Sequence, residues 1–526
     1  MPSRDRLWIF GVSVLLLGVL ILSNLDHTVD DAFIGFRYAE NLVHGHGLVF
    51  NPGERVEGYT NFLWVILIAP FVALSVDPEA VAKVLGFIAS ALTLLAVVRF
   101  GPRPAPCREI AWLAPLFLAS SPPFVVWTTG GMETPLFTCL VAWSTVLVAE
   151  GLERGALAQG VGGLLGAAAL TRPEGAGVAA VLAILAWALG PRTPGFRRSF
   201  LRCFGMFLLV FLPYFFWRWW YYGQFLPNTF YAKVGAGPAQ VIRGLYYTHV
   251  FLAFSGYWLL LPLIGLRWSA RRQASLLLGG LTLALVGYTV FVGGDALPMF
   301  RFIAPLLPTF FLLLAMGAAG ILERFGAWRY ARPSLVALLL VFAVCAARVG
   351  FTGAPYEDVR RDIQEVSAWR EVGAWFRAHA SPDATIAVIP AGAIPYLSKL
   401  RAIDMLGLND VTIAHRDMPA LGSGPPGHEK FDVDYVLSRR PDIILLGVYR
   451  LDARPLPPQD LIQYSYEAEW RMLDSPRFLV EYGLRSARAP GGYFPYFVRV
   501  KSSPATAPVR GAVLRRRLLC GYNRWE

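Results

Sequence analysis

LWIFGVSVLLLGVLIL, the run from Leu7 to Leu22, carries no charge and is apolar at nearly every position. Blocks of similar length recur along the chain between short polar loops, and as helices they approach the roughly 30 Å thickness of a hydrocarbon core. Of the 526 residues, 55% are hydrophobic and only 16% are charged, whereas soluble proteins carry about 25% charged residues. The sequence therefore predicts a polytopic α-helical membrane protein and excludes a soluble one.

The first block follows a short basic segment that contains Arg4 and Arg6. A cleaved signal peptide has a similar outline, but this apolar run is long and no A-x-A cleavage site follows it. We expect an uncleaved first span that enters from the cytosol. Further candidate spans cover residues 60–76, 80–98, 111–126, 134–150, 156–170, 175–190, 203–219, 249–266, 274–292, 302–322 and 334–350.

The loops between these blocks fall into two chemical classes. Arginine-rich loops lie at residues 99–108, 192–202, 267–272 and 324–332, and unusual polar strings lie at residues 29–61, 127–135, 171–175, 221–233 and 293–302. Because positive loops face the cytosol, we expect the arginine loops inside and the polar strings outside. This arrangement requires one crossing between residues 60 and 98, with 60–76 re-entrant or interfacial. It gives about 11 crossings and an external C-terminus.

After Gly350 the composition becomes that of an ordinary soluble domain, for which we expect a compact extracytoplasmic α/β fold. Its expected elements are a helix at Tyr356–Ala380, buried strands at Thr385–Ile389 and Asp442–Leu446, and the end of a helix at Tyr435–Arg439. The expected domain limits are residues 1–350 for the membrane domain, 351–502 for the α/β domain and 503–526 for a basic tail. The tail is expected to lie on anionic lipid.

Charge and cysteine content give little support to two classes of site. The formal net charge is +12, but the arginines sit in short loops beside apolar blocks, which is typical of membrane topology rather than of nucleic-acid binding. The five cysteines show no C-x-x-C spacing, so neither a zinc site nor a dense disulfide framework is indicated.

Two adjacent carboxylates, Asp30 and Asp31, begin the first outer loop. They suit two roles: capping of the helix that follows, or general-base or cation-binding chemistry at the membrane surface. Both hold if one aspartate caps while the other does chemistry. Arg37 is expected near the exposed face of this helix, beside Glu40. Downstream, Glu57, Tyr59 and Asn61 alternate as in a ligand-binding edge.

The other outer loops each place one or two ionisable groups among glycine, proline and aromatic residues. Ionisable groups beside a bilayer core are costly and usually functional, so acids and bases gathered on one face suit an enzyme that handles a polar group on a lipid anchor. These candidates are Glu133, Arg172 with Glu174, Asn228 with Lys233, and Asp295 with Arg301. In the α/β domain, His428 is the candidate for acceptor recognition, although a lone loop histidine is often incidental.

Six motifs together carry a family resemblance. They are D-D-A-F-I-x-F-R-Y-A from Asp30, G-L-V-F-N-P-G-E-R-V-E-G-Y-T-N-F-L-W from Gly47, G-G-M-E-T-P-L-F from Gly130, T-R-P-E-G from Thr171, Y-Y-G-x-x-x-P-N-T-F-Y-A-K from Tyr221 and G-G-D-x-x-P-x-F-R-F from Gly293. Over residues 1–450 the chain resembles bacterial membrane glycosyltransferases of the GT-C superfamily, near the mycobacterial terminal arabinofuranosyltransferases. The first motif is highly specific.

The resemblance implies transfer of a sugar from a polyprenyl phosphate to a glycan, lipid or protein acceptor outside the cytosol, at the bacterial inner membrane. Asp30 or Asp31 would be the base, and the other would orient the acceptor or bind a cation. Lys233, Arg172 and Arg301 become candidates for the donor phosphate. Inversion is expected, because no second carboxylate is placed as a nucleophile. The identity of the sugar, arabinofuranose among others, stays open, and so does a requirement for a divalent cation as cofactor.

Two other classes of protein stay open. A transporter or flippase usually carries polar breaks at mid-span and two matching halves, whereas the charges here gather in the outer loops and no repeat is visible. A non-catalytic envelope assembly protein would leave Asp30, Asp31 and Lys233 without a purpose.

Overall fold

The computed structural model describes most of the chain. The described residues are 3–101, 110–235, 237–326, 333, 336–337, 354–419, 421–448, 450–456, 461 and 466–500. The expected span at 334–350 lies outside them except for residues 336–337, and the expected tail at 503–526 lies entirely outside.

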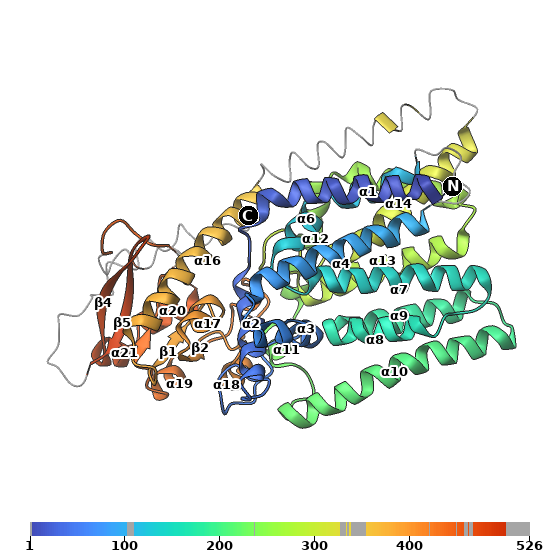
Figure 1. Ribbon diagram of the computed structural model, residues 1–526. Helices are drawn as coiled ribbons and strands as arrows, with labels where there is room; N and C mark the ends of the chain where they lie inside the picture. The colour runs from blue at the N-terminus through green and yellow to red at the C-terminus, as the bar shows by residue number, and fades with distance from the viewer. Residues whose placement is uncertain are drawn as a thin grey trace. The chain divides into compact units, whose positions relative to one another are not determined.

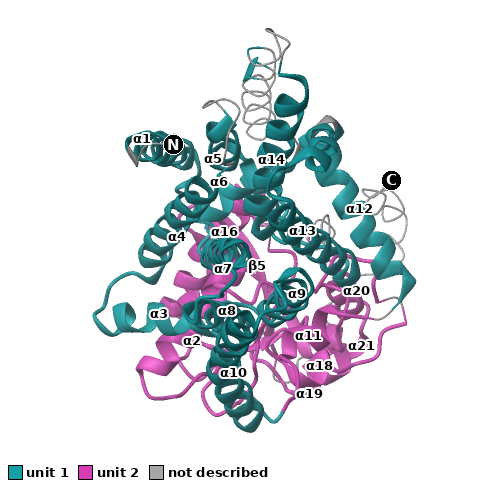
Figure 2. Ribbon diagram, turned by 90° about the vertical axis from the view of Figure 1, so that its right-hand side faces the viewer, with its two compact units in different colours: residues 1–28, 60–223, 237–360 teal, residues 29–59, 224–236, 361–526 magenta. Residues whose placement is uncertain are grey.

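The chain divides into two compact units that interleave along the sequence (Figure 2). Unit 1 contains residues 1–28, 60–223 and 237–360, and unit 2 contains residues 29–59, 224–236 and 361–526. The sequence suggests consecutive domains with a limit near residue 350. The structure instead adds the first outer loop and part of the 221–233 loop to the C-terminal unit.

Unit 1 is built from helices (Figure 1). They are α1 (Ser3–Ile21), η1 (Leu22–Asn24), α3 (Phe62–Ala73), α4 (Pro78–Phe100), α5 (Ile110–Ser120), α6 (Pro122–Thr129), α7 (Thr134–Arg154), α8 (Gly160–Thr171), α9 (Glu174–Leu189), α10 (Pro194–Tyr222), α12 (Pro238–Ser255), η2 (Tyr257–Trp268), α13 (Arg272–Val292), η3 (Ala304–Leu306) and α14 (Leu307–Phe325).

Six helical segments in the described part of the chain are long and apolar enough to cross a membrane, and the number rises to eight if two bent pairs are each one span. The six involve α1, α4, α7, α10, α13 and α14; the bent pairs are α5 with α6, at 51°, and α12 with part of η2, at 90°. The predicted helical membrane protein is confirmed, whereas the count of about 11 crossings stays a prediction. With 12 residues, α3 is about 18 Å long and too short to cross, which fits one crossing within 60–98.

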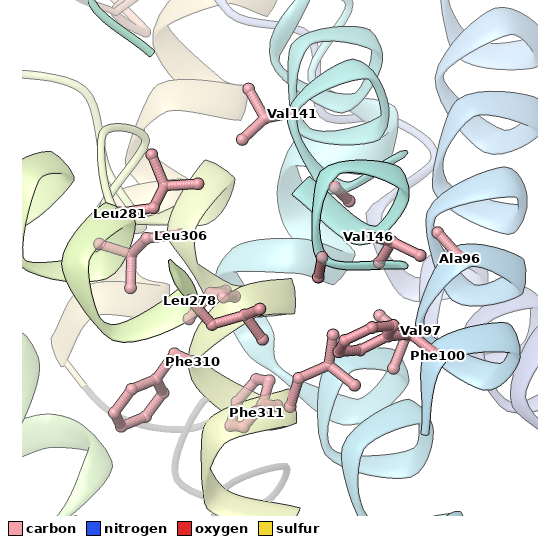
Figure 3. Close-up of a cluster of buried hydrophobic side chains, with 14 of the residues drawn as sticks. Ala96, Val97, Phe100, Val141, Val146, Leu278, Leu281, Leu306, Phe310 and Phe311 are labelled. Atoms are coloured by element: carbon pink, nitrogen blue, oxygen red, sulfur yellow. The ribbon is translucent and has the colours of Figure 1, made fainter. Parts of the chain in front are cut away.

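The core of unit 1 lies where α4, α7, α13 and α14 meet. In Figure 3, Leu278 of α13 lies near Phe310 and Phe311 of α14, and Leu281 of α13 lies beside Leu306; all five side chains are buried. On another side of the bundle, α8 packs against α10 through glycine, because a Cβ on Gly162 would lie 1.8 Å from the carbonyl oxygen of Cys203. Small residues allow this close approach of membrane helices.

Unit 2 contains the predicted α/β fold, which is confirmed. Its five-stranded sheet has the order β2-β1-β3-β5-β4, with β1 parallel to β2 and β3, and β5 antiparallel to β3 and β4. The strands are β1 (Thr385–Val388), β2 (Arg401–Asp404), β3 (Ile443–Ile444), β4 (Tyr482–Ala489) and β5 (Gly492–Arg499). The helices are α2 (Asp30–Val43), α11 (Asn228–Lys233), α16 (Ala354–His379, which begins in unit 1), α17 (Ala393–Ser398), α18 (Val411–Ala414), α19 (Val433–Ser438), α20 (Glu467–Leu473) and α21 (Pro476–Glu481).

The first outer loop closes one edge of this sheet. The Asn51 side chain accepts a hydrogen bond from the backbone N–H of Ala402 at 3.0 Å and donates one to its carbonyl at 2.8 Å. Since Ala402 lies in the edge strand β2, the amide takes the place that a further strand would take. The first loop is therefore an integral part of unit 2.

Candidate active site

Asp30 is the first residue of α2, but its side chain caps another helix, α17. Both carboxylate oxygens accept backbone hydrogen bonds at the start of α17, from Gly392 at 2.8 Å and from Ala393 at 2.7 Å. A Cβ on Gly392 would lie 1.9 Å from the carbonyl oxygen of Asp30, so only glycine fits this contact. Burial raises the pKa of the Asp30 carboxyl to about 7, although the two N–H groups oppose the rise. The capping role is therefore real, but the capped helix is α17.

Asp31, the next residue, faces a cation. Its Oδ2 lies 3.9 Å from the Nζ of Lys233, and both side chains are about a quarter exposed, 25% and 28%. Lys233 is the last residue of α11. The structure thus brings together the expected base and one expected phosphate ligand, which lie some 200 residues apart in the sequence.

Gly427 forms the surface on which the Lys233 stem lies. A Cβ at this position would lie 3.0 Å from Cε and 3.2 Å from Cγ of Lys233, and the glycine has a φ of +81° that other residues rarely adopt. The loop around Gly427 is held by Glu429, which accepts from the N–H groups of Gly422 and Gly424 at 2.7 Å each. A fixed backbone therefore borders the side of Lys233.

Arg37 differs from its expected exposed position, because its side chain is buried, with 6% of its surface accessible. The guanidinium donates to the carbonyls of Phe50 at 2.6 Å, Leu400 at 2.8 Å and Pro395, and to Oδ1 of Asn51 at 3.1 Å. Burial lowers the pKa of Arg37 to about 10, so it stays charged at neutral pH. Through these hydrogen bonds the Arg37 side chain links α2 to the first loop and to the region of α17.

Glu57, Tyr59 and Asn228 also lie in unit 2 and are buried. The Asn228 amide donates to the carbonyls of Gly407 and Leu408, at 2.9 Å each, and its backbone N–H donates to Glu57 O at 3.1 Å. The Tyr59 ring packs on Tyr38, with centroids 4.4 Å apart. These contacts position α11, whose end carries Lys233.

His428 follows Gly427 directly. Its ring stacks on Tyr466, with centroids 4.4 Å apart, and its Nδ1 lies 3.2 Å from the carbonyl oxygen of Pro426. Lys430, two residues further on, is buried and donates to Ala414 O at 2.8 Å. The loop is thus anchored on both sides of His428, whose role in acceptor recognition stays a prediction.

Unit 1 holds a second set of the expected residues around Arg172, which we name the Glu133 cluster: Asn61, Glu133, Arg172 and Glu174. Arg172 donates to Glu133 at 2.8 Å and also to Glu174, and Asn61 donates to the other oxygen of Glu133 at 2.9 Å. All four residues lie at helix ends: Asn61 before α3, Glu133 before α7, Arg172 after α8 and Glu174 at the start of α9. The spacing of the motifs alone gave no sign of this network.

Arg301 lies beside the Glu133 cluster and is paired as well. It donates two hydrogen bonds to Asp295, at 2.6 and 3.0 Å. Both Arg301 and Arg172 lie over the Phe302 ring, at 5.4 and 5.2 Å from its centroid. The two preceding residues, Met299 and Phe300, have φ values of 55° and 51°, a strained conformation that is often kept at functional sites.

The pairing of these arginines bears on their expected role. Arg172 faces two carboxylates and Arg301 faces one, so a donor phosphate would have to compete with anions already in contact. Lys233 lies 3.9 Å from the carboxylate of Asp31, a longer and weaker contact than those of the two arginines, so its ammonium is better placed to bind a phosphate. Binding of a phosphate by Arg172 or Arg301 stays a prediction.

The described residues do not gather a metal-binding group. Among them, no cluster of three or more His, Cys, Asp or Glu side chains could hold an ion. The donor set around the first-loop aspartates also fits a cation poorly, since both oxygens of Asp30 accept N–H groups and Asp31 faces an ammonium.

The chain is similar to two curated proteins named terminal β-(1→2)-arabinofuranosyltransferase. One, from Mycobacterium tuberculosis, is 32% identical over 276 residues, which is 47% of this chain and 42% of the relative. The other, from Corynebacterium glutamicum, is 28% identical over 360 residues, 60% of this chain and 50% of the relative. The chain thus spans half or less of the length of these relatives. Residues 357–497 also match a family described as a domain of unknown function, DUF8728.

Solved structures show the same fold at low sequence identity. ArnT from Cupriavidus metallidurans bound to undecaprenyl phosphate superposes with a TM-score of 0.57 at 12% identity, and covers 85% of this chain and 94% of its own. The arabinofuranosyltransferase AftD from Mycobacteria gives a TM-score of 0.50 at 15% identity, and covers 96% of this chain and 40% of its own. The chain therefore has a GT-C-like membrane fold, and its predicted resemblance to the terminal arabinofuranosyltransferases is confirmed.

Proposed function

We propose that the chain is an integral-membrane glycosyltransferase that transfers a sugar from a polyprenyl phosphate to an acceptor hydroxyl. The observation that carries the proposal is the contact between Asp31 and Lys233, 3.9 Å apart beside the buried Asp30. A carboxylate and an ammonium side by side supply a base for the acceptor and a charge for the leaving phosphate. The names of the relatives and the undecaprenyl phosphate in the ArnT structure support this class of donor.

In the reaction, the acceptor oxygen forms a bond to the anomeric carbon while the bond from that carbon to the phosphate oxygen breaks. The bonding electrons go to the phosphate, and the proton of the acceptor hydroxyl goes to Asp31. Lys233 stabilises the negative charge that develops on the phosphate. One displacement of this kind inverts the anomeric centre.

Asp30 serves a positioning role in this proposal. Its two bonds to α17 fix the first turn of α2, and Asp31 is the next residue of that turn. A side chain whose two oxygens already accept backbone N–H groups is less well placed to take a proton from a substrate. We therefore assign the base to Asp31 and the support to Asp30.

The proposed location is the bacterial inner membrane, with the motif loops on the outer face. The alternation of arginine-rich and motif loops supports this orientation, and a lipid phosphate suits a site that nucleotide sugars do not reach. The acceptor is a glycan, lipid or protein hydroxyl. A divalent cation as a further neutralising charge stays an alternative, which loss of transfer on chelation would support.

Substitution of the two aspartates tests the base. In proteoliposomes with a polyprenyl-phosphate sugar, Asp31→Asn should lower single-turnover transfer by about 10²–10⁴-fold, the usual contribution of a general base. Asp26→Asn is the matched control, since Asp26 is an exposed carboxylate just before the first loop, and it should transfer normally. Near-normal transfer by Asp31→Asn with loss in a folded Asp30→Asn variant would move the base to Asp30.

A second measurement tests the donor phosphate. Lys233→Gln should weaken donor binding or slow transfer, while Lys83→Gln, which removes a lysine paired with Glu79, should not. Normal donor titration of Lys233→Gln would remove this lysine from the site. Mass spectrometry of the lipid that copurifies with the wild type would identify the sugar.

A further inference from the structure

Unit 1 contains a cavity that the proposed reaction does not use. Its volume is about 580 Å³, and its charged lining consists of Arg99, Glu150, Glu153, Arg154, Arg271 and Arg272. These residues lie at the end of α4, the end of α7 and the start of α13. The cavity therefore lies where arginine-bearing ends of three helices meet.

The charges in this lining do not balance. Glu150 accepts from Arg99 at 2.9 Å and Arg154 at 3.0 Å, and Glu153 accepts from Arg271 at 2.7 Å. Arg272 is exposed and forms no ion pair within the described part of the chain. Among the described lining residues, four guanidinium groups thus accompany two carboxylates, which amounts to a net charge of +2.

Helix lengths give the level of the cavity relative to a bilayer. The 23 residues of α4 and the 21 residues each of α7 and α13 measure about 34 and 32 Å, close to the thickness of the hydrocarbon core. The other end of α7 follows Glu133, and the other end of α13 precedes Asp295. The cavity thus lies a full span away from these motif loops, at the level of lipid headgroups.

We infer that this cavity binds the phosphate of an anionic phospholipid headgroup. Arginine is well suited to phosphate, which its planar group binds through two parallel hydrogen bonds. The start of α13 adds the positive end of one helix dipole, which the C-terminal ends of α4 and α7 oppose. The guanidinium groups therefore supply the attraction for an anion. A headgroup is the favoured source of the phosphate because the cavity opens at the depth where headgroups are concentrated.

The test uses the full chain in nanodiscs that contain phosphatidylglycerol and phosphatidylcholine. Native mass spectrometry counts the retained lipids of each kind. The double variant Arg154→Gln/Arg272→Gln should lower the preference for phosphatidylglycerol by about fivefold per arginine, the change that about 1 kcal/mol gives. The matched control is Arg197→Gln/Arg198→Gln, two exposed arginines near the start of α10 that do not line the cavity.

Three outcomes decide the inference. Loss of phosphatidylglycerol in the cavity variant, with retention in the control, supports it. Equal retention in both variants overturns it, because the cavity arginines would then not contribute to the preference. Equal loss in both also overturns it, because arginines in general would then account for the preference. Displacement of the lipid by millimolar inorganic phosphate would also overturn it, since the cavity would then be a site for a soluble anion. The basic tail is present in every variant, so any lipid that it retains does not affect the comparison.

Discussion

The buried carboxyl of Asp30 predicts how the stability of the protein changes with pH, a property that is independent of the proposed catalytic role of Asp31. The change is Asp30→Asn, which keeps the size of the side chain and removes its charge. In the wild type, burial raises the pKa of the carboxyl from 3.8 to about 7, with Asp31 and Asp362 also raising it. Because the folded state holds the proton more tightly than the unfolded state, the free energy of unfolding falls as the pH rises from about 4 to about 7.

The structure sets the size of this effect. A rise from 3.8 to about 7, at about 1.4 kcal/mol for each pKa unit, amounts to about 4 kcal/mol, of which about 3 kcal/mol falls between pH 5 and 8. Asp404 is buried too, and burial raises its pKa to about 6, which adds about 1 kcal/mol in the same interval. The wild type should therefore lose about 4 kcal/mol of stability from pH 5 to pH 8, and Asp30→Asn only about 1 kcal/mol.

The assay is chemical denaturation of the full chain in micelles at pH 5 and pH 8, followed by tryptophan fluorescence. Asp26→Asn is the control, and it should keep the wild-type pH dependence because that carboxylate is exposed. The comparison is of the change between pH 5 and pH 8 within each variant, because the asparagine side chain accepts only one of the two backbone N–H groups and therefore also lowers stability at both pH values. A full wild-type loss of stability in Asp30→Asn would refute the reasoning, since the pH dependence would then arise elsewhere.

Two further predictions concern the site and its orientation. Gly427→Ala should slow single-turnover transfer about tenfold, because its Cβ would displace the Lys233 stem. The control is Gly53→Ala, at a similar φ of +84° but with open space around the position, which should lower stability without slowing transfer. Equal transfer rates in the two variants would contradict the steric argument. In intact cells, an impermeant maleimide should label Cys520 and leave Cys107 unmodified until the membrane is permeabilised, and the reverse pattern would place the motif loops in the cytosol. Both cysteines lie outside the described residues.

Most of the fold follows from apolar runs, because a run long enough to cross a bilayer has few other stable outcomes. The block at 134–150 becomes α7 and the periodic segment at 356–380 becomes α16, each displaced by only a few residues at its ends. The hairpin of β4 and β5 was missed. The β4 sequence, YGLRSARA, is polar with two arginines, so its strand is set by pairing with β5 rather than by its own pattern.

The candidate site was predictable in its residue types but not in its partners. Arg37 stands out in the sequence as a charged residue in a specific motif, yet its acceptors Pro395 and Leu400 lie about 360 residues away. Sequence spacing within a motif cannot predict contacts between residues so far apart in the chain. Gly392 and Gly427 were missed for the same reason, although the P-G pair before His428 is a turn signal that could have drawn attention to the second glycine.

The contacts of the first loop change how the role of the C-terminal residues can be tested. The sequence suggests acceptor recognition by an outer domain that a truncation near Gly350 would remove. In the structure, such a truncation would also remove the N–H donors that Asp30 uses, two carbonyl acceptors of Arg37 and the strand that Asn51 pairs with. Loss of transfer would then reflect a misplaced Asp31 as readily as a lost acceptor. A substitution at His428, whose ring packs on Tyr466, leaves these supports in place and so tests the predicted role of this residue in acceptor recognition more directly.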